Sequence, residues 1–338
     1  MSRAGASVGV AGKLARDRRC TVRALPRLAR IASLLALAAA LACGERAAAP
    51  APSERAQFDG VRAFRDLADL VQLGPRPAGS AAAAQARELI RERLRQAGWP
   101  VEAHEFSVAR AGAAPVAMAN LIARHGVETA PRYLVVTHYD TKNLAGISFV
   151  GANDGASGAA VLLELARAMA GDAEPPLELI FCDGEEAFGA NITPDDGLYG
   201  SKALAQRMAD DGSLAAVRGV ILVDMVGDRD LNLALDFGSS PTLRKDFEAA
   251  AAKLGFPPPF DPGQALSVID DHSPFQEHGV EEVLALIDFQ YGARVSPGPL
   301  WHTAGDTLDA VSAESLERVG KTLVEALRAM GAGRSARP

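Results

Sequence analysis

Residues 177–188 read LELIFCDGEEAF, in which a mostly apolar run leads directly into Asp-Gly-Glu-Glu. A short apolar run of this length predicts a buried β-strand that ends where the polar residues begin. The same arrangement recurs in YLVVTHYD (133–140) and in VILVDMVGD (220–228). The sequence therefore predicts buried strands whose ends carry the polar, chemically capable side chains.

Segments with the apolar spacing of helices separate these strands. We expect helices over 58–73, 81–97, 158–170, 200–208, 242–254 and 313–330, and strands over 101–108, 118–123, 133–137, 177–182, 217–226, 231–235 and 282–287. Alternation of strands and helices is typical of α/β proteins with a largely parallel sheet. We therefore predict a three-layer α/β/α sandwich with a central mixed, mostly parallel sheet, formed by one domain over 57–335.

The first 43 residues predict an export signal. Six arginines between positions 16 and 30 precede an apolar run over 31–42, which is too short to span a bilayer. The sequence Ala40-Leu41-Ala42-Cys43-Gly44 resembles a bacterial lipobox, in which Cys43 would be lipidated, and a plain signal peptide is the alternative. Residues 44–56 predict an Ala/Pro-rich linker. We expect an exported protein, either a periplasmic or outer-membrane lipoprotein or a secreted one, with no other membrane attachment.

Charge and cysteine content exclude several classes of partner and site. The chain has a formal net charge of −7, and the basic leader makes the remainder still more acidic, which argues against nucleic acid as a partner. The three cysteines, Cys20, Cys43 and Cys182, show no spacing typical of thiolate zinc sites. Cys182 lies in an apolar run, so we expect it to be a buried free thiol.

Six polar clusters, nearly all of them at the carboxyl ends of expected strands, lie where open α/β sheets place their functional sites. They are His138-Tyr139-Asp140, Asn153-Asp154-Gly155, Asp183-Gly184-Glu185-Glu186, Asp224 with Asp228, Asp270-Asp271-His272, and Trp301-His302. Zinc binds imidazole nitrogen and carboxylate oxygen, and these clusters supply both without sulfur. At a strand end, the side chains of Glu185 and Glu186 diverge, so one can bind a metal while the other acts as a general base.

As a set, these segments resemble the M28 metallopeptidases and the glutaminyl cyclases that share their zinc-exopeptidase-like fold. The matching segments are GPRPAGS (74–80), HYDTK (138–142), FVGANDGASGAAVLLELARAM (149–169), FCDGEEAF (181–188), DGLYGSKALA (196–205), VDMVGD (223–228), DDHSPF (270–275) and WHTAGDT (301–307). The resemblance covers most of the predicted domain and implies that this domain is catalytic.

The resemblance implies roles that are common to both branches of the family. Asp154, Glu186 and His302 match the metal ligands, and Glu185 matches the general acid/base. In the peptidases, His138 and Asp224 hold a second metal ion, with Asp154 bridging the two ions.

The cyclase branch, by the same resemblance, retains a single zinc ion. Asp224 then matches an acid that holds the α-amine of the substrate, and Asp270 matches a member of a hydrogen-bond network near the reacting centre. Trp301 matches an aromatic wall of the substrate pocket. Lys142 is a candidate pocket residue, although a solvated lysine fits the sequence equally well.

Two enzyme activities remain open from the sequence. The motifs around Lys142, Asp270 and Trp301 resemble cyclases more than peptidases, which favours a glutaminyl-peptide cyclotransferase that acts on peptide N-termini with one Zn²⁺. The alternative is an M28 aminopeptidase with two zinc ions, because the full two-metal ligand set is present by residue type. The segment GANIT (189–193) stands where animal-type cyclases carry a pocket tryptophan. A non-catalytic binding protein is disfavoured because every ligand and Glu185 are retained.

Overall fold

The structure is a computed structural model that describes residues 55–335, except 111 and 127–130. The predicted export signal, Cys43 and almost all of the predicted linker lie outside the described residues. Among the helices of the described part, none combines the length and apolar character required to cross a membrane.

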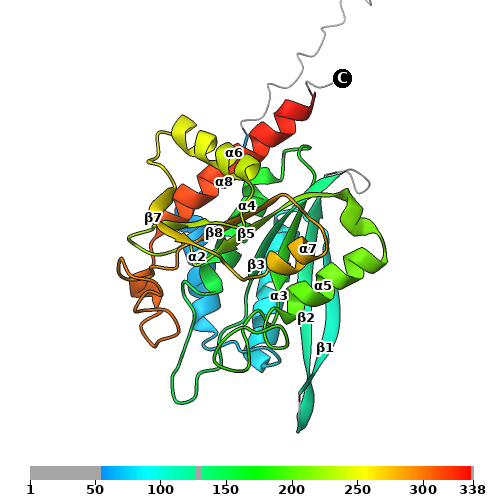
Figure 1. The fold of residues 1–338 in the computed structure, drawn as a ribbon, viewed down its shortest axis with the longest axis vertical. Helices are drawn as coiled ribbons and strands as arrows, with labels where there is room; N and C mark the ends of the chain where they lie inside the picture. The colour runs from blue at the N-terminus through cyan, green and yellow to red at the C-terminus, as the bar shows by residue number, and fades with distance from the viewer. Residues whose placement is uncertain (1–54, 111, 127–130, 336–338) are drawn as a thin grey trace, which may run out of the picture. The chain divides into compact units, whose positions relative to one another are not determined.

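A six-stranded sheet forms the centre of the fold (Figure 1). Its strand order is β1 (Val101–Arg110), β2 (Ala113–His125), β4 (Leu177–Cys182), β3 (Arg132–His138), β5 (Val217–Asp224) and β8 (Val283–Ile287). The strands β4, β3, β5 and β8 are parallel to their neighbours within this group, whereas β2 pairs antiparallel with both β1 and β4. The predicted mixed, mostly parallel sheet is therefore confirmed.

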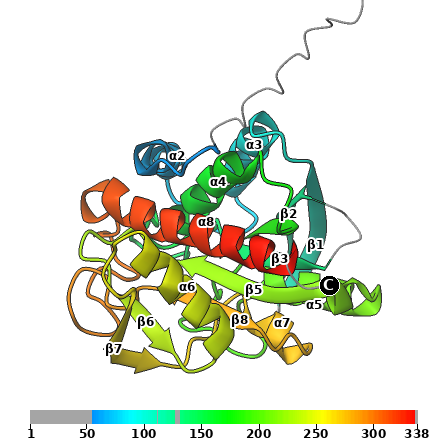
Figure 2. The same ribbon diagram turned by 90° about the horizontal axis from the view of Figure 1, so that it is seen from above.

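Helices cover both faces of this sheet (Figure 2). One layer contains α2 (Gly60–Gln72), α3 (Ala81–Gln96), α4 (Ala156–Met169) and α8 (Ala313–Ser335), with α6 (Pro241–Lys253) packed against α8. The opposite layer contains α5 (Tyr199–Asp210) and α7 (Ser273–Glu277), and short 3₁₀ helices span Ser213–Ala216 and Leu308–Ala310. The central strands read as continuous apolar runs because alternate residues are buried on opposite faces. In β3, Val135 faces the α4 layer, whereas Leu134 and Val136 face the α5 layer.

A second sheet of two parallel strands, β6 (Leu233–Asp236) and β7 (Phe260–Leu266), lies apart from the central sheet on the α5 and α7 side. The sequence predicted β6 but not β7, because Pro262 and Gly263 are unfavourable inside a strand. The pairing register shifts by several residues between Ala234 and Leu235, which accommodates these two residues outside the ladder. The loop that follows β7 leads to Asp270, so this small sheet positions one of the predicted site residues.

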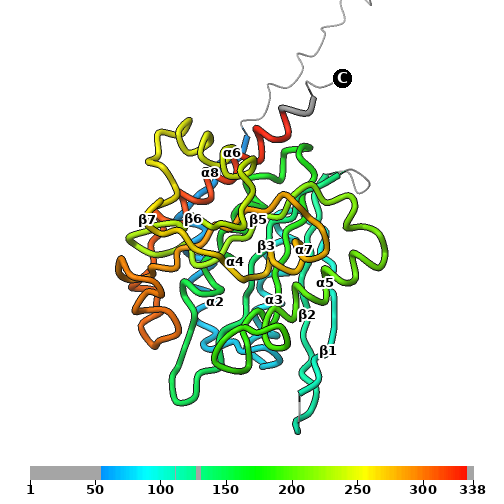
Figure 3. Tube along the Cα trace, in the orientation of Figure 1, coloured from blue at the N-terminus to red at the C-terminus, as the bar shows by residue number. Residues whose placement is uncertain are grey.

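The carboxyl ends of the four parallel strands lie level with one another. His138 at the end of β3 pairs in register with Cys182 at the end of β4, and Asp224 at the end of β5 pairs with Ile287 at the end of β8. Cys182 is a buried free cysteine, as predicted. The long connection from β8 to α8, orange in Figure 3, starts from the same edge. Loops from four strands therefore converge where the polar clusters were predicted.

Candidate functional site

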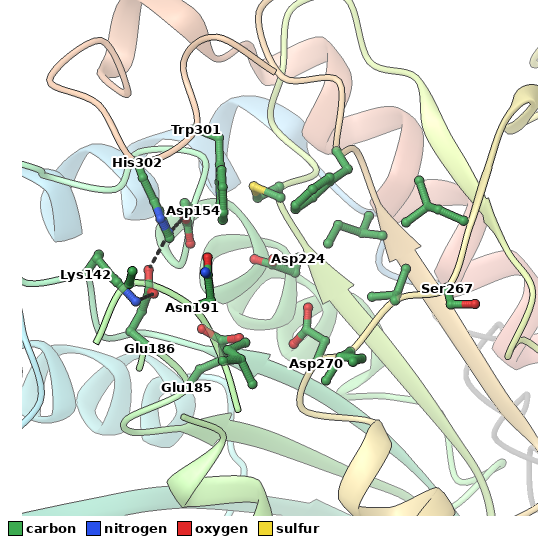
Figure 4. Close-up of a pocket in the computed structure, with 18 residues that line it drawn as sticks. Lys142, Asp154, Glu185, Glu186, Asn191, Asp224, Ser267, Asp270, Trp301 and His302 are labelled. Atoms are coloured by element: carbon green, nitrogen blue, oxygen red, sulfur yellow. Dashed lines mark hydrogen bonds and ion pairs between the residues drawn. The ribbon is translucent and has the colours of Figure 1, made fainter. Parts of the chain in front are cut away.

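A cavity of about 220 Å³ lies at this edge of the sheet (Figure 4). Eight of the nine side chains predicted for the site line it, namely Lys142, Asp154, Glu185, Glu186, Asp224, Asp270, Trp301 and His302. The ninth, His138, is buried beneath the cavity and contacts Asp154 and Asp224. Apolar residues, which include Met225, Ile287 and Phe289, also line the cavity. The loops thus bring every predicted site residue together.

Asp154, Glu186 and His302 form a triad that fits a metal ion. The Nε2 atom of His302 lies 3.4 Å from Oδ2 of Asp154 and 3.2 Å from Oε1 of Glu186. Tetrahedral zinc with ligands at about 2.0–2.1 Å places neighbouring ligand atoms about 3.3 Å apart, whereas a direct charge-assisted hydrogen bond is about 2.7–2.9 Å long. Oδ2 of Asp154 is buried without a hydrogen-bond partner among the described residues. The donor set and its spacing therefore suit zinc.

A second triad shares Asp154. The Nε2 atom of His138 lies 3.2 Å from Oδ1 of Asp154 and 3.2 Å from Oδ1 of Asp224. On the other side of the imidazole ring, Nδ1 lies 3.6 Å from Oδ1 of Asp140. Asp154 therefore directs one oxygen toward each histidine, and both triads hold ligand atoms close enough to share an ion.

Glu185 and Asp270 are buried acids with other carboxylates close by. Burial raises the pKa of Glu185 well above its usual range, and the nearby Asp270 and Glu186 carboxylates raise it further. Burial, Asp224 and Asp271 likewise raise the pKa of Asp270 well above its usual range. An acid with a raised pKa takes up a proton readily at neutral pH, which is the property required for proton transfer.

Two residues that the sequence analysis did not single out hold the loop before α4 in place. The carboxylate of Asp306 accepts hydrogen bonds from the backbone N–H groups of Asn153 (2.7 Å) and Asp154 (3.1 Å). The fully buried guanidinium of Arg76 donates to the carbonyls of Val150 (2.8 Å) and Gly151 (3.3 Å). Both residues lie inside matching motifs, WHTAGDT and GPRPAGS, and their position there was the only signal in the sequence.

The aromatic and cationic candidates also contact the triad of Asp154, Glu186 and His302. The indole of Trp301 stacks on the imidazole of His302, with ring centroids 3.9 Å apart and an interplanar angle of 22°. His302 itself adopts a positive φ of 54°, a conformation that is uncommon for a residue with a side chain. The ammonium of Lys142 lies 3.4 Å from Oε2 of Glu186, and the side chain is only 4% exposed. The solvated alternative for Lys142 is therefore wrong.

Comparisons with known proteins agree on one family. The model of peptidase family M28 matches residues 120–327. A glutaminyl-peptide cyclotransferase from Bothrops jararaca is 32% identical over 289 residues, which cover 72% of this chain and 74% of the relative. The crystal structure of a glutaminyl cyclase from an Acidobacteriales bacterium is 34% identical with a TM-score of 0.76, covering 84% of this chain and 99% of that one. A glutaminyl cyclase from Porphyromonas gingivalis is 25% identical with a TM-score of 0.72, covering 81% and 99%.

The family match spans more than half of the chain and includes every residue of both triads. With its α/β fold, its cavity at the carboxyl edge of the sheet and its close relatives, this chain belongs to peptidase family M28.

Proposed function

We propose that this protein is a zinc-dependent glutaminyl-peptide cyclotransferase, which converts the N-terminal glutamine of a peptide into pyroglutamate and releases ammonia. We base this on the cavity in which Glu185 lies beside the Asp154, Glu186 and His302 triad. The relatives that share at least 30% identity with the chain and carry this name support it. The substrate is the N-terminus of a peptide or protein.

The reaction joins the α-amine nitrogen of glutamine to its γ-carbonyl carbon and breaks the bond to the γ-amide nitrogen. Asp154, Glu186 and His302 would hold a zinc ion, and the chemistry it would supply is Lewis-acid polarisation of the γ-carbonyl oxygen. Glu185 accepts a proton from the α-amine and returns it to the departing nitrogen, which leaves as ammonia, so no proton is gained or lost overall. Asp224 holds the α-amine, and Asp270 lines the cavity near Asp224 (Figure 4). The cavity, whose floor is formed by buried residues, holds a compact substrate conformer and limits the access of water.

Mass spectrometry of one peptide tests this proposal against aminopeptidase activity. The purified, zinc-loaded protein is incubated with a peptide that begins with glutamine. Loss of ammonia from an otherwise intact peptide is the expected result. Release of free glutamine would instead establish hydrolysis, and no change with several such peptides would refute both activities.

We propose that the reaction uses one zinc ion, and changing His138 to Ala tests this number, since His138, Asp154 and Asp224 could hold a second ion. In the proposed one-ion enzyme, this variant is expected to retain its zinc and to keep kcat/KM within about tenfold of the wild type. In a two-ion enzyme, kcat/KM would fall more than about a hundredfold, because removing a direct metal ligand has a larger effect than changing an outer-sphere contact. Zinc content by elemental analysis and cyclisation rate are measured together, with circular dichroism to verify folding.

Changing Trp301 to Ala tests the aromatic wall. The indole lines the cavity and stacks on His302, so its loss is expected to lower kcat/KM about thirtyfold, corresponding to about 2 kcal/mol of lost apolar contact. The matched variant Trp301→Phe keeps an aromatic face and should retain most of the activity. Equal activity of Trp301→Ala and the wild type would show that Trp301 does not contribute to substrate binding.

We further propose that the protein is exported and anchored through a lipid on Cys43. The basic and apolar leader and the lipobox-like sequence around Cys43 support this proposal. Expression in a bacterial host with radiolabelled palmitate should label the wild type but not Cys43→Ser. A soluble, unlabelled wild-type protein in the culture medium would instead favour a plain signal peptide.

A further inference from the structure

We propose that the side chain of Asn191 binds the first peptide group of the substrate, between its glutamine and the second residue. This inference rests on the proposed function and adds a residue that determines how a peptide, rather than free glutamine, is held. Asn191 lines the cavity, and in the view of Figure 4 its carboxamide appears among the cavity-lining side chains of Asp154, Asp224 and Glu185.

Burial of the lining residues distinguishes the floor of the cavity from its mouth. Asp154, Glu185, Glu186 and Asp224 are each at most 7% exposed, so they form the floor. The exposed lining residues are Ala190, Asn191, Ser267 and Ile269, so they form the mouth. When the γ-carbonyl of the substrate glutamine reaches the triad on the floor, the following residues of the peptide lie at the mouth. The first peptide group therefore passes Asn191.

The loop that carries Asn191 directly follows Glu185 and Glu186, and hydrogen bonds hold both of its ends. The Asp196 carboxylate accepts hydrogen bonds from the backbone N–H groups of Phe188 (2.7 Å) and Gly189 (2.8 Å) and from the hydroxyl of Tyr199 (2.6 Å). The Lys202 ammonium donates to the carbonyls of Pro194 (2.8 Å) and Gly197 (2.9 Å). These bonds fix both ends of the loop and present its tip, 190–192, to the cavity. A preorganised tip binds substrate with a smaller loss of conformational entropy.

The chemistry of Asn191 matches a neutral peptide group. Its carboxamide makes no hydrogen bond to any residue that the structure describes, so both its donor and its acceptor are available. Most other polar groups that line the cavity are carboxylates, which repel the free carboxylate of glutamine itself. A neutral amide can instead donate to the carbonyl and accept from the N–H of a peptide bond. Asn191 thereby favours peptides over the free amino acid.

The test couples a change in the enzyme to a change in the substrate. Cyclisation is measured for a glutaminyl peptide and for its analogue in which an ester oxygen replaces the first peptide N–H, after subtraction of the rate without enzyme. The ester removes one hydrogen bond and weakens the other, and a neutral hydrogen bond is worth about three- to tenfold in affinity. The enzymes are the wild type, the nearly isosteric Asn191→Leu, and Asn143→Ala as a control at an exposed asparagine outside the cavity.

Asn191→Leu is expected to raise KM for the peptide about tenfold with kcat and zinc content unchanged. The amide-to-ester change should also raise KM about tenfold in the wild type and in Asn143→Ala. It should change KM little in Asn191→Leu, because this substitution has already removed the contact that the ester removes. Equal sensitivity of all three enzymes to the ester would overturn the inference. Failure of the wild type to cyclise the peptide at all would refute the proposed function instead, which keeps the two outcomes distinct.

Discussion

Replacing Glu185 by Gln is expected to lower the cyclisation rate about a thousandfold while zinc remains bound. Gln keeps the size and shape of the side chain but cannot accept and return a proton, and general acid–base catalysis contributes about 10²–10⁴-fold. Glu185 is not a member of either metal-binding triad, so zinc content should match that of the wild type. Stopped or discontinuous assays of ammonia release, together with elemental analysis, measure both quantities.

The matched control is Glu277→Gln, because Glu277 is an exposed acid on α7 outside the cavity. This variant should retain full activity. If Glu185→Gln kept its rate, another group would carry the proton, and Asp270 would be the first to test because its pKa is also raised well above its usual range by burial. If Glu185→Gln lost zinc as well as activity, the residue would contribute to metal binding.

Replacing Asp154 by Ala is expected to abolish activity through loss of zinc. The change removes the carboxylate that both triads share and leaves His302 and Glu186 as an incomplete site. Loss of an outer-sphere partner already costs about 10–100-fold in metal affinity, so loss of a direct ligand should exceed a hundredfold. Competition with a fluorescent zinc chelator measures the affinity, and a strong chelator added to the wild type should reproduce the inactive state.

Asp309→Ala serves as the control for this change, since Asp309 is an exposed acid in the 3₁₀ helix Leu308–Ala310. Its zinc affinity and activity should equal those of the wild type. Excess zinc should restore the chelated wild type but not Asp154→Ala. Recovery of Asp154→Ala at ordinary zinc concentrations would show that Asp154 is dispensable for binding.

The fold and the membership of the site could largely be predicted because both depend on strong local signals. Each parallel strand is a run of apolar residues that ends abruptly at polar ones, as in LELIFCDGEEAF, and parallel strands bring their carboxyl ends to one edge. Pairing in register of His138 with Cys182 then follows from the sheet alone. The site residues were named from the motifs, and the structure brings eight of them to one cavity with His138 buried beneath it.

The features that could not be predicted from the sequence depend on contacts between distant segments. Lys142 was named as a candidate pocket residue, but its ion pair with Glu186 joins two distant segments, so the sequence left the solvated alternative open. The strand β7 forms despite Pro262 and Gly263 because β6 supplies a partner. Asp306 acts 152 residues away on the backbone of Asp154. Periodicity reports the environment of a residue within its own element, so it carries no information about such partners.

The hydrogen bonds of Arg76 set a lower limit on the length of a self-sufficient catalytic unit. The region matched by the family model begins at residue 120 and omits this arginine, together with α2 and α3. A fragment truncated there would leave the carbonyls of Val150 and Gly151 without their donor and would uncover the helix α4 that begins just after Asp154. The N-terminal helices are therefore an integral part of the enzyme, and any minimal version intended for engineering has to start before α2.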